Sequence, residues 1–257
     1  MNGKKKTGMI RSWYMITRAE QFIKLFPDEP AFRSRQIEQA LYDPAVNGWS
    51  EISTLGEPMR QKLEQEVPWM SLKADQVLAS ANGDAVKALV ALGDGERIET
   101  VLMKNARDNW TVCLSAQVGC AMRCSFCATG RLGFKRNLNT DEIVDQVRFW
   151  QRYLNDVRRA TSDERISNLV LMGQGEPLAN YENVKTALNL ILKYTELGPT
   201  NITVSTVGLL PVLDQILTDD TWPNVRLAIS LHAADETKRR SLMPSTAPDF
   251  FAKLADW

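Results

Sequence analysis

The chain has 257 residues, of which 44% are hydrophobic, and its 31 basic and 31 acidic residues give a net charge of zero. This length buries a substantial core, as one large domain or as a large domain with a small appendage. The balanced charge argues against a protein that coats nucleic acid by charge alone, and no apolar run approaches the roughly 20 residues of a membrane span. Together with the absence of a secretory signal pattern, these features predict a cytoplasmic protein without a membrane partner.

The first part of the chain has the pattern of short helices. Apolar residues at helical spacing, with prolines near the boundaries, predict three of them, over residues 18–26, 31–42 and 58–67. The pattern then changes to two apolar runs between Ala85 and Met103, separated by a Gly-Asp-Gly turn that predicts a β-hairpin. We therefore expect residues 1–95 to form an N-terminal helical module with a β-hairpin. Its Phe32-Arg33-Ser34-Arg35 segment offers cations beside an aromatic ring, which could contact RNA, although exposed arginines are more commonly solvated.

Residues 96–257 alternate between strand-like and helix-like segments. Four apolar runs predict strands at residues 110–114, 167–172, 202–205 and 226–231. Helical patterns follow them at residues 140–153, 181–194, 210–217 and from about residue 235. Repeated strand–loop–helix units predict a parallel α/β sheet or barrel, in which functional groups gather at the C-terminal ends of the strands.

Three of the four cysteines form a C-x3-C-x2-C run at Cys120, Cys124 and Cys127, and the fourth, Cys113, precedes them. A structural zinc site requires four nitrogen or sulfur ligands, and the single histidine, His232, is far downstream, so zinc is a poor fit. Disulfides belong to oxidising compartments, and ferredoxin clusters are ligated by four cysteines at other spacings. The run therefore favours an iron–sulfur cluster with three protein ligands, which leaves one iron open to a further ligand. Around it, residues 115–138 contain four basic side chains and no acid.

Three further loops follow the predicted strands. They are Met172-Gly-Gln-Gly-Glu-Pro177, Val204-Ser-Thr-Val-Gly208 and Ser230-Leu-His232. Glycines let a backbone approach a ligand closely, and Glu176 with neighbouring carbonyls could accept hydrogen bonds from an ammonium group. Each loop alone has an ordinary explanation as a turn, a helix cap or a packed histidine. Their position at successive strand ends after the cysteine loop favours one shared site.

Five motifs resemble one known family. They are CLSAQVGCAMRCSFCATG from Cys113, GFKRNL, MGQGEPL, VSTVG and ISLHA. In this order they are similar to the RlmN/Cfr family of radical S-adenosylmethionine (SAM) enzymes, which methylate adenine in ribosomal RNA. The likeness runs from the N-terminal helices to the Leu-Met-Pro near Met243. It implies an α/β fold, a partial (β/α)6 barrel with about four units present, preceded by a small helical RNA-recognition domain and a β-hairpin.

The resemblance also implies roles for individual residues. Cys120, Cys124 and Cys127 would bind a [4Fe-4S] cluster whose free iron chelates the methionine part of SAM. The rest of the SAM site would be lined by Gly175, Glu176, Ser205, Ser230, Leu231 and His232. Cys113 stands where the family has the cysteine that resolves a protein–RNA adduct, and Glu99 aligns with the assigned proton acceptor. From the sequence alone, Cys113 could also be a small apolar strand residue, and Glu99 a surface glutamate.

The implied reaction is methylation of carbon 2 of an adenine in the peptidyl transferase centre of 23S rRNA, and of tRNA. Such a carbon is too unreactive for polar methyl transfer, so the family uses a radical and a methylated cysteine, with electrons from a donor such as flavodoxin or ferredoxin. Two alternatives stay open: methylation at carbon 8, and an RNA-binding remnant without catalysis.

The chain departs from the family at its end. The methyl-carrying cysteine belongs beyond the Leu-Met-Pro segment, yet no cysteine follows Cys127. The last strand–helix units and one cofactor-binding asparagine are missing as well. We therefore expect an N-terminal fragment or an incomplete gene product that could bind cluster and cofactor but could not by itself methylate RNA.

Overall fold

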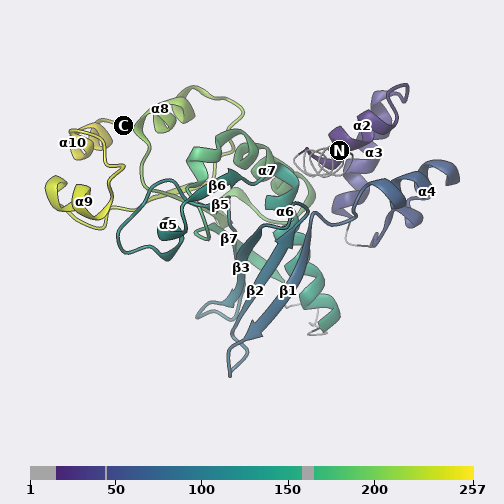
Figure 1. Ribbon diagram of the computed structural model, residues 1–257, viewed down its shortest axis with the longest axis horizontal. Coiled ribbons are helices and arrows are strands. Elements are labelled where there is room, and N and C mark those ends of the chain that lie inside the picture. Colours follow the sequence, from purple (N-terminus) through teal and green to yellow (C-terminus); the bar gives the residue numbers. More distant parts are fainter. Residues whose placement is uncertain (1–15, 44, 158–164) are drawn as a thin grey trace, which may run out of the picture.

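A computed structural model describes residues 16–43, 45–157 and 165–257 (Figure 1). Its centre is a seven-stranded sheet with the strand order β1-β2-β3-β4-β7-β8-β9. The strands are β1 (Leu72–Ala79), β2 (Ala85–Leu92), β3 (Arg97–Lys104), β4 (Trp110–Cys113), β7 (Ile166–Leu171), β8 (Ile202–Thr206) and β9 (Arg226–Ile229). β1 to β4 pair antiparallel, and β4, β7, β8 and β9 pair parallel.

The parallel half consists of four strand–helix units. The helices are α6 (Thr140–Arg152), α7 (Tyr181–Tyr194), α8 (Leu210–Thr218) and α9 (Glu236–Leu242), each following one of the strands β4, β7, β8 and β9. This arrangement confirms the predicted α/β fold with four units of a barrel-type sheet. α6 begins at Thr140 as predicted, and Asn139 before it is the N-cap, which forms a reciprocal capping box with Glu142.

The antiparallel part is larger than the predicted hairpin. β2 and β3 form it as expected, and β1 adds a third strand on the outer side of β2. β1 was missed because its sequence, LKADQVLA, does not alternate and only Leu72 in it is buried. Figure 1 shows these three strands projecting beyond the helices as one long ribbon.

The two faces of the sheet differ in burial. Val112, Leu169 and Val204 point to one face and are buried against α6 and α7, where Trp150 and Leu188 complete the core. The alternate residues point to the other face and are mostly half-exposed. The strand ends and their loops border this second face.

The N-terminal helices have a hydrophobic cluster of their own. α2 (Arg18–Leu25), α3 (Ala31–Tyr42), the short helix η1 (Trp49–Glu51) and α4 (Glu57–Glu66) pack around Phe22, Ile37, Trp49 and Leu63. This cluster ends at Val67, and the main core begins at Leu72. The division at residues 95 and 96 stays a prediction; those residues lie in the turn between β2 and β3, and the first fifteen residues are outside the described part.

A buried ion network joins the helical module to α6. The guanidinium of Arg18, 1% exposed, lies 3.1 Å from Asp141 and 2.8 Å from Asp145. Asp145 also accepts from the backbone N–H and hydroxyl of Ser71 and from Arg148. Because buried charges are tolerated only when paired, these contacts fix where the module sits on the core.

The remaining elements are short. They are β5 (Gln117–Gly119), α5 (Ala128–Leu132), β6 (Phe134–Asn137), the π-helical turn η2 (Tyr153–Val157), η3 (Pro177–Asn180), η4 (Pro199–Asn201) and α10 (Phe250–Asp256). In Figure 1, α9 and α10 lie on the side of the molecule opposite α2 to α4. Within the described ranges, no helix has the length and apolar character needed to span a membrane.

Candidate iron–sulfur and cofactor site

The cysteine run lies in a loop that is closed by its own small sheet. β5 and β6 pair antiparallel, with Gln117 opposite Asn137, and residues 120–133 project between them. The backbone N–H of Cys120 donates to the carbonyl of Gly133 at 3.0 Å, and that of Cys127 donates to Cys124 at 3.0 Å. The loop backbone is therefore held by hydrogen bonds at its base and within the run.

The three thiols lie near one another and away from bulk water. Cys120 and Cys124 are buried and Cys127 is half-buried, and all are free thiols. Burial raises the pKa of Cys120 and of Cys124, and the nearby Cys127 raises both further. Glu176 is close enough to add to the same effect. Cluster assembly would therefore have to displace protons from these thiols.

These thiols fit a [4Fe-4S] cluster better than a single ion. Among the described residues, no three side chains of His, Cys, Asp or Glu converge as the ligands of one metal ion would. In a four-iron cluster each thiolate binds a different iron, so the ligand sulfurs need not meet at one point. Three neighbouring thiols with no fourth cysteine in the run match a cluster that keeps one iron open.

The loop after β7 packs tightly on the segment after β4. Gly175 has φ +97°, a left-handed conformation, and a Cβ there would lie 2.5 Å from Cβ of Gln117. Gln117 in turn accepts the backbone N–H of Glu176 at 2.8 Å. A glycine is needed at position 175 both for the backbone conformation and for the space.

Glu176 connects two of the predicted loops. Its carboxylate is buried and accepts backbone N–H groups from Leu178 at 3.0 Å and from Val207 at 2.8 Å. Burial raises the pKa of this carboxyl group, and hydrogen bonds from Thr206 and from these N–H groups oppose the rise. The side chain predicted to accept from an ammonium group is therefore already engaged with the protein backbone.

The loops after β8 and β9 meet through their serines. The hydroxyl oxygens of Ser205 and Ser230 are 3.3 Å apart, and Leu231 beside them is exposed. His232 has φ 56° and its ring lies 4.4 Å from that of Phe126, in the cysteine loop. The structure thus joins Ser205, near the end of β8, to Ser230, and it places His232 against Phe126 of the cysteine loop. Glu176 lies near enough to Cys120 and Cys124 to interact with them electrostatically.

Cys113 and Glu99 belong to the half-exposed face of the sheet. Cys113 pairs directly with Val101 across β3 and β4, and Glu99 is two residues from Val101, so their side chains share one face. Burial raises the pKa of Cys113, against a hydrogen bond from the backbone of Met172. Glu99 is partly exposed and forms an ion pair with Lys87 at 3.0 Å. Cys113 is therefore at the rim of the site, whereas Glu99 has a surface partner.

Three further residues support the site, and of these only Gln117 lies within a motif quoted from the sequence. Gln146 of α6 donates to the carbonyl of Ser115 at 3.0 Å and accepts its N–H at 2.8 Å. Gln117 holds the Gly-rich loop, and Arg239 of α9 is buried behind two of the loops. Gln146 was detectable in principle, as a polar residue on the apolar stripe of an amphipathic helix, whereas nothing local distinguishes Arg239 from Arg240.

Two of the four basic side chains around the cysteines are neutralised. Arg136 lies 2.7 Å from both Asp94 and Glu142, and Lys135 pairs with Glu96. The acid-free segment of the sequence is thus not a uniformly basic surface, because acids from outside the segment fold against it.

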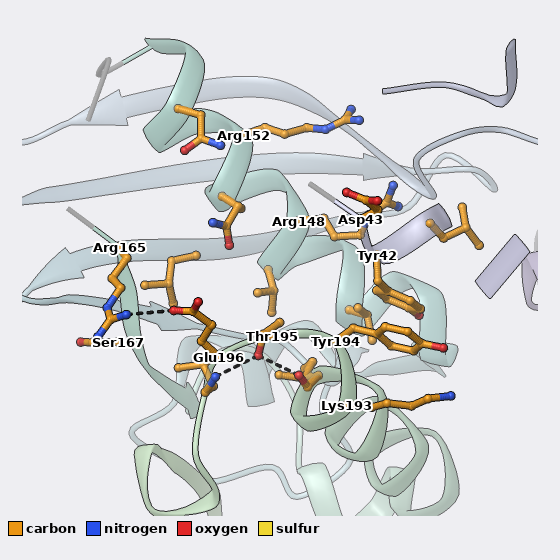
Figure 2. Close-up of a pocket in the computed structure, with 18 of the residues that line it drawn as sticks. Tyr42, Asp43, Arg148, Arg152, Arg165, Ser167, Lys193, Tyr194, Thr195 and Glu196 are labelled. Atoms are coloured by element: carbon orange, nitrogen blue, oxygen red, sulfur yellow. Dashed lines mark hydrogen bonds and ion pairs between the residues drawn. The ribbon is translucent and has the colours of Figure 1, made fainter. Parts of the chain in front are cut away.

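A cavity of about 860 Å³ lies elsewhere, between α3 and the ends of α6 and α7 (Figure 2). Tyr42 and Tyr194 stack on one side of it, with ring centroids 4.9 Å apart, and Arg165 pairs with Glu196 on the other. Arg165 precedes β7, so the cavity is at the N-terminal ends of the strands. It contains none of the predicted site residues.

Residues 114–256 match the radical SAM superfamily, and the chain belongs to this superfamily. Within it, the chain is 39% identical over 228 residues to a probable dual-specificity RNA methyltransferase RlmN of Aquifex aeolicus, covering 88% of this chain and 62% of that protein. It is 41% identical over 236 residues to the protein of the same name in Heliobacterium modesticaldum, covering 86% and 60%. The resemblance predicted from the motifs is thereby confirmed.

A solved structure agrees. A radical SAM methyltransferase from Sphaerobacter thermophilus is 35% identical, with a TM-score of 0.80 over 95% of this chain and 70% of that one. The chain spans about 60% of the length of the curated relatives it matches.

Proposed function

We propose that this chain provides the cluster-binding and SAM-binding core of an RNA methyltransferase that modifies carbon 2 of an adenine in 23S rRNA and in tRNA. The observation that carries the proposal is the meeting of the cysteine loop, Glu176 and the Ser205–Ser230 pair at one rim of the sheet. The similarity to proteins named dual-specificity RNA methyltransferase supports RNA as the substrate.

In this proposal Cys120, Cys124 and Cys127 hold a [4Fe-4S] cluster. When bound, the cluster and SAM supply a radical able to attack an otherwise unreactive aromatic carbon. Gly175, Glu176, Ser205, Ser230, Leu231 and His232 line the SAM site. The Glu176 carboxylate already accepts one backbone N–H at each oxygen, and its remaining lone pairs would accept from the ammonium group of SAM.

The protein's own groups would then handle thiol and proton chemistry. Cys113, at the rim and beside Met172, is proposed as the resolving thiol, since burial keeps it protonated until it reacts. Glu99 is proposed as the proton acceptor, which requires that it leave its ion pair with Lys87. The free thiols and the proposed RNA substrates are consistent with a cytoplasmic enzyme. Its cluster would receive electrons from a flavodoxin or a ferredoxin.

The proposal has a two-stage test. Anaerobic reconstitution should give about four iron and four sulfide per chain, and dithionite should then drive cleavage of SAM to 5′-deoxyadenosine. The methylation stage uses this chain and the same chain extended by the C-terminal part of an RlmN relative, each incubated with 23S rRNA and tRNA. Mass spectrometry of the nucleosides should find 2-methyladenosine in the RNA that was incubated with the extended chain. A product methylated at carbon 8, or a chain that binds iron but never cleaves SAM, would contradict the proposal.

A further inference from the structure

Arg239 is a buried cation that touches two loops of the site. Its side chain is 1% exposed, on α9. Nη2 donates to the carbonyl of Val207 at 2.5 Å and to that of Ser230 at 3.3 Å. Val207 follows β8 and Ser230 follows β9, so one guanidinium joins the loops that carry the two candidate SAM-binding serines.

The same helix is also joined to the cysteine loop. The backbone N–H of Ser125, between Cys124 and Cys127, donates to the carbonyl of Leu242 at the end of α9 at 2.8 Å. Arg239 is near enough to Cys124 to interact with its thiol electrostatically. α9 therefore contacts three of the four loops that form the candidate site.

The packing behind Arg239 restricts its position. The ring centroid of Phe250 lies 3.6 Å from the guanidinium carbon, and Nη1 donates to the hydroxyl of Thr246 at 2.6 Å. Phe250 is itself buried and lies against Gly208, where a Cβ would be 2.9 Å from its ring. The planar guanidinium thus has an aromatic surface on one face and acceptors at its edge, a combination that a lysine cannot reproduce.

Arg239 makes no ion pair with a carboxylate of the described residues. Among the described residues, no carboxylate lies within ion-pair distance of it, and its Nε–H has no hydrogen-bond partner there. A buried cation is costly unless an anion is close. The groups whose charge acts on it electrostatically are the Cys124 thiol and the carboxylate of Glu236 on the same helix.

We propose that Arg239 is a positioning residue that locks the Val207 and Ser230 loops against the cysteine loop. The inference rests on the proposed function, since it assigns Arg239 to the same site. It adds a residue that contacts neither the cluster ligands nor SAM directly but sets the distance between the loops that hold them.

The test compares Arg239→Met and Arg239→Lys with Arg240→Met. Arg240 is the next residue on the same helix, its side chain is 50% exposed, and its ion pair is with Glu236 of the same helix. Hydrogen–deuterium exchange of the protein without cluster is measured first. Both Arg239 variants should exchange faster at Val207–Gly208 and Ser230–Ala233, by about tenfold, while Arg240→Met matches the parent.

SAM binding is then measured on reconstituted protein, from the shift of the reduced cluster's EPR signal and from equilibrium titration. We expect the Arg239 variants to bind SAM about tenfold more weakly, with Arg239→Met also losing bound iron. If Arg239→Met does not fold, Arg239→Lys alone is compared with Arg240→Met and the parent. Parental exchange and affinity in Arg239→Lys would overturn the inference while leaving the proposed function intact. A parent protein that never binds SAM would overturn both.

Discussion

The side-chain carboxylate of Glu176 accepts the backbone N–H of Val207 at 2.8 Å, so a residue that follows β7 holds the loop that follows β8. Gly175 beside it packs on Gln117, which follows β4. The connection explains how four loops from separate strands keep one arrangement. Each loop is bonded to its neighbour as well as to its own strand. Some of these bonds join two backbones, as from Ala116 to Gln174, and others join a side chain to a backbone, as at Glu176 and Val207.

Replacing Glu176 by Gln should loosen this connection without changing the volume of the side chain. The amide oxygen can keep one backbone N–H, but the amide nitrogen then faces the other, leaving a buried donor unsatisfied at a cost of about 2 kcal/mol. We expect SAM affinity to fall about tenfold while iron content is retained. Glu182→Gln is the matched control, since that side chain is 71% exposed on α7. Parental SAM affinity in Glu176→Gln would contradict the role.

The four cysteines should separate into two groups. Alanine at position 120, 124 or 127 removes a proposed iron ligand, so each variant should lose most of its iron, sulfide and brown colour. Cys113→Ala should keep them, together with SAM cleavage, because Cys113 lies on β4 outside the cysteine loop. In the extended chain it should abolish RNA methylation. Loss of the cluster in Cys113→Ala would show that the thiol is a ligand instead.

Gly175→Ala should disrupt the cofactor loop. The left-handed φ of +97° and the approach to Gln117 both oppose a Cβ, and we expect a loss of about 2 to 3 kcal/mol in stability, measured by urea unfolding. SAM binding should be lost with it. Gly198→Ala is the control, because a Cβ there meets nothing within 4 Å. Equal stability of the two variants would refute the packing argument.

Asp145 should make the free energy of unfolding depend on pH in the acidic range. Burial alone raises its pKa, but the guanidinium groups of Arg18 and Arg148 outweigh burial and lower the pKa to about 2, from an ordinary value of 3.8. Because its pKa is lowered by folding, ionised Asp145 stabilises the fold at pH values above its ordinary pKa. This contribution is lost as the pH falls from about 4 through about 2. Asp145→Asn should therefore unfold more easily at pH 7, by about 3 kcal/mol, and lose much of this acid dependence.

The control for Asp145 is Asp75→Asn. Asp75 pairs with Arg97 at 2.6 Å, but the arginine side chain is 57% exposed. Exposed ion pairs contribute less than about 1 kcal/mol, so this variant should be nearly as stable as the parent. Unfolding curves by circular dichroism at several pH values measure both. If Asp145→Asn loses stability at acidic pH as much as the parent does, the acid dependence comes from other carboxyl groups.

The sequence predicted those helices and strands whose apolar residues recur at regular spacing. The prediction failed for a strand in which buried and exposed residues do not alternate. The helix 181–194 has the predicted bounds because an apolar stripe runs along it, including Val184, Leu188 and Ile191. β1 was missed because it is an exposed edge strand held by pairing with β2 rather than by a buried face. The ion pairs of Lys135 with Glu96 and of Arg136 with Asp94 were equally hidden, since these partners are distant in the chain.

The sequence by itself determined the chemistry that is available: three closely spaced thiols, a Gly-rich loop and two serine loops at strand ends. Residue types and short spacings can be read from the sequence alone, because they do not depend on contacts between distant segments. Only the tertiary structure decided how these loops are held together, because that depends on contacts between distant segments. Glu176 at Val207, Gln146 at Ser115 and Arg239 at Ser230 are such contacts, and each pairs a backbone group of one loop with a side chain from another part of the chain.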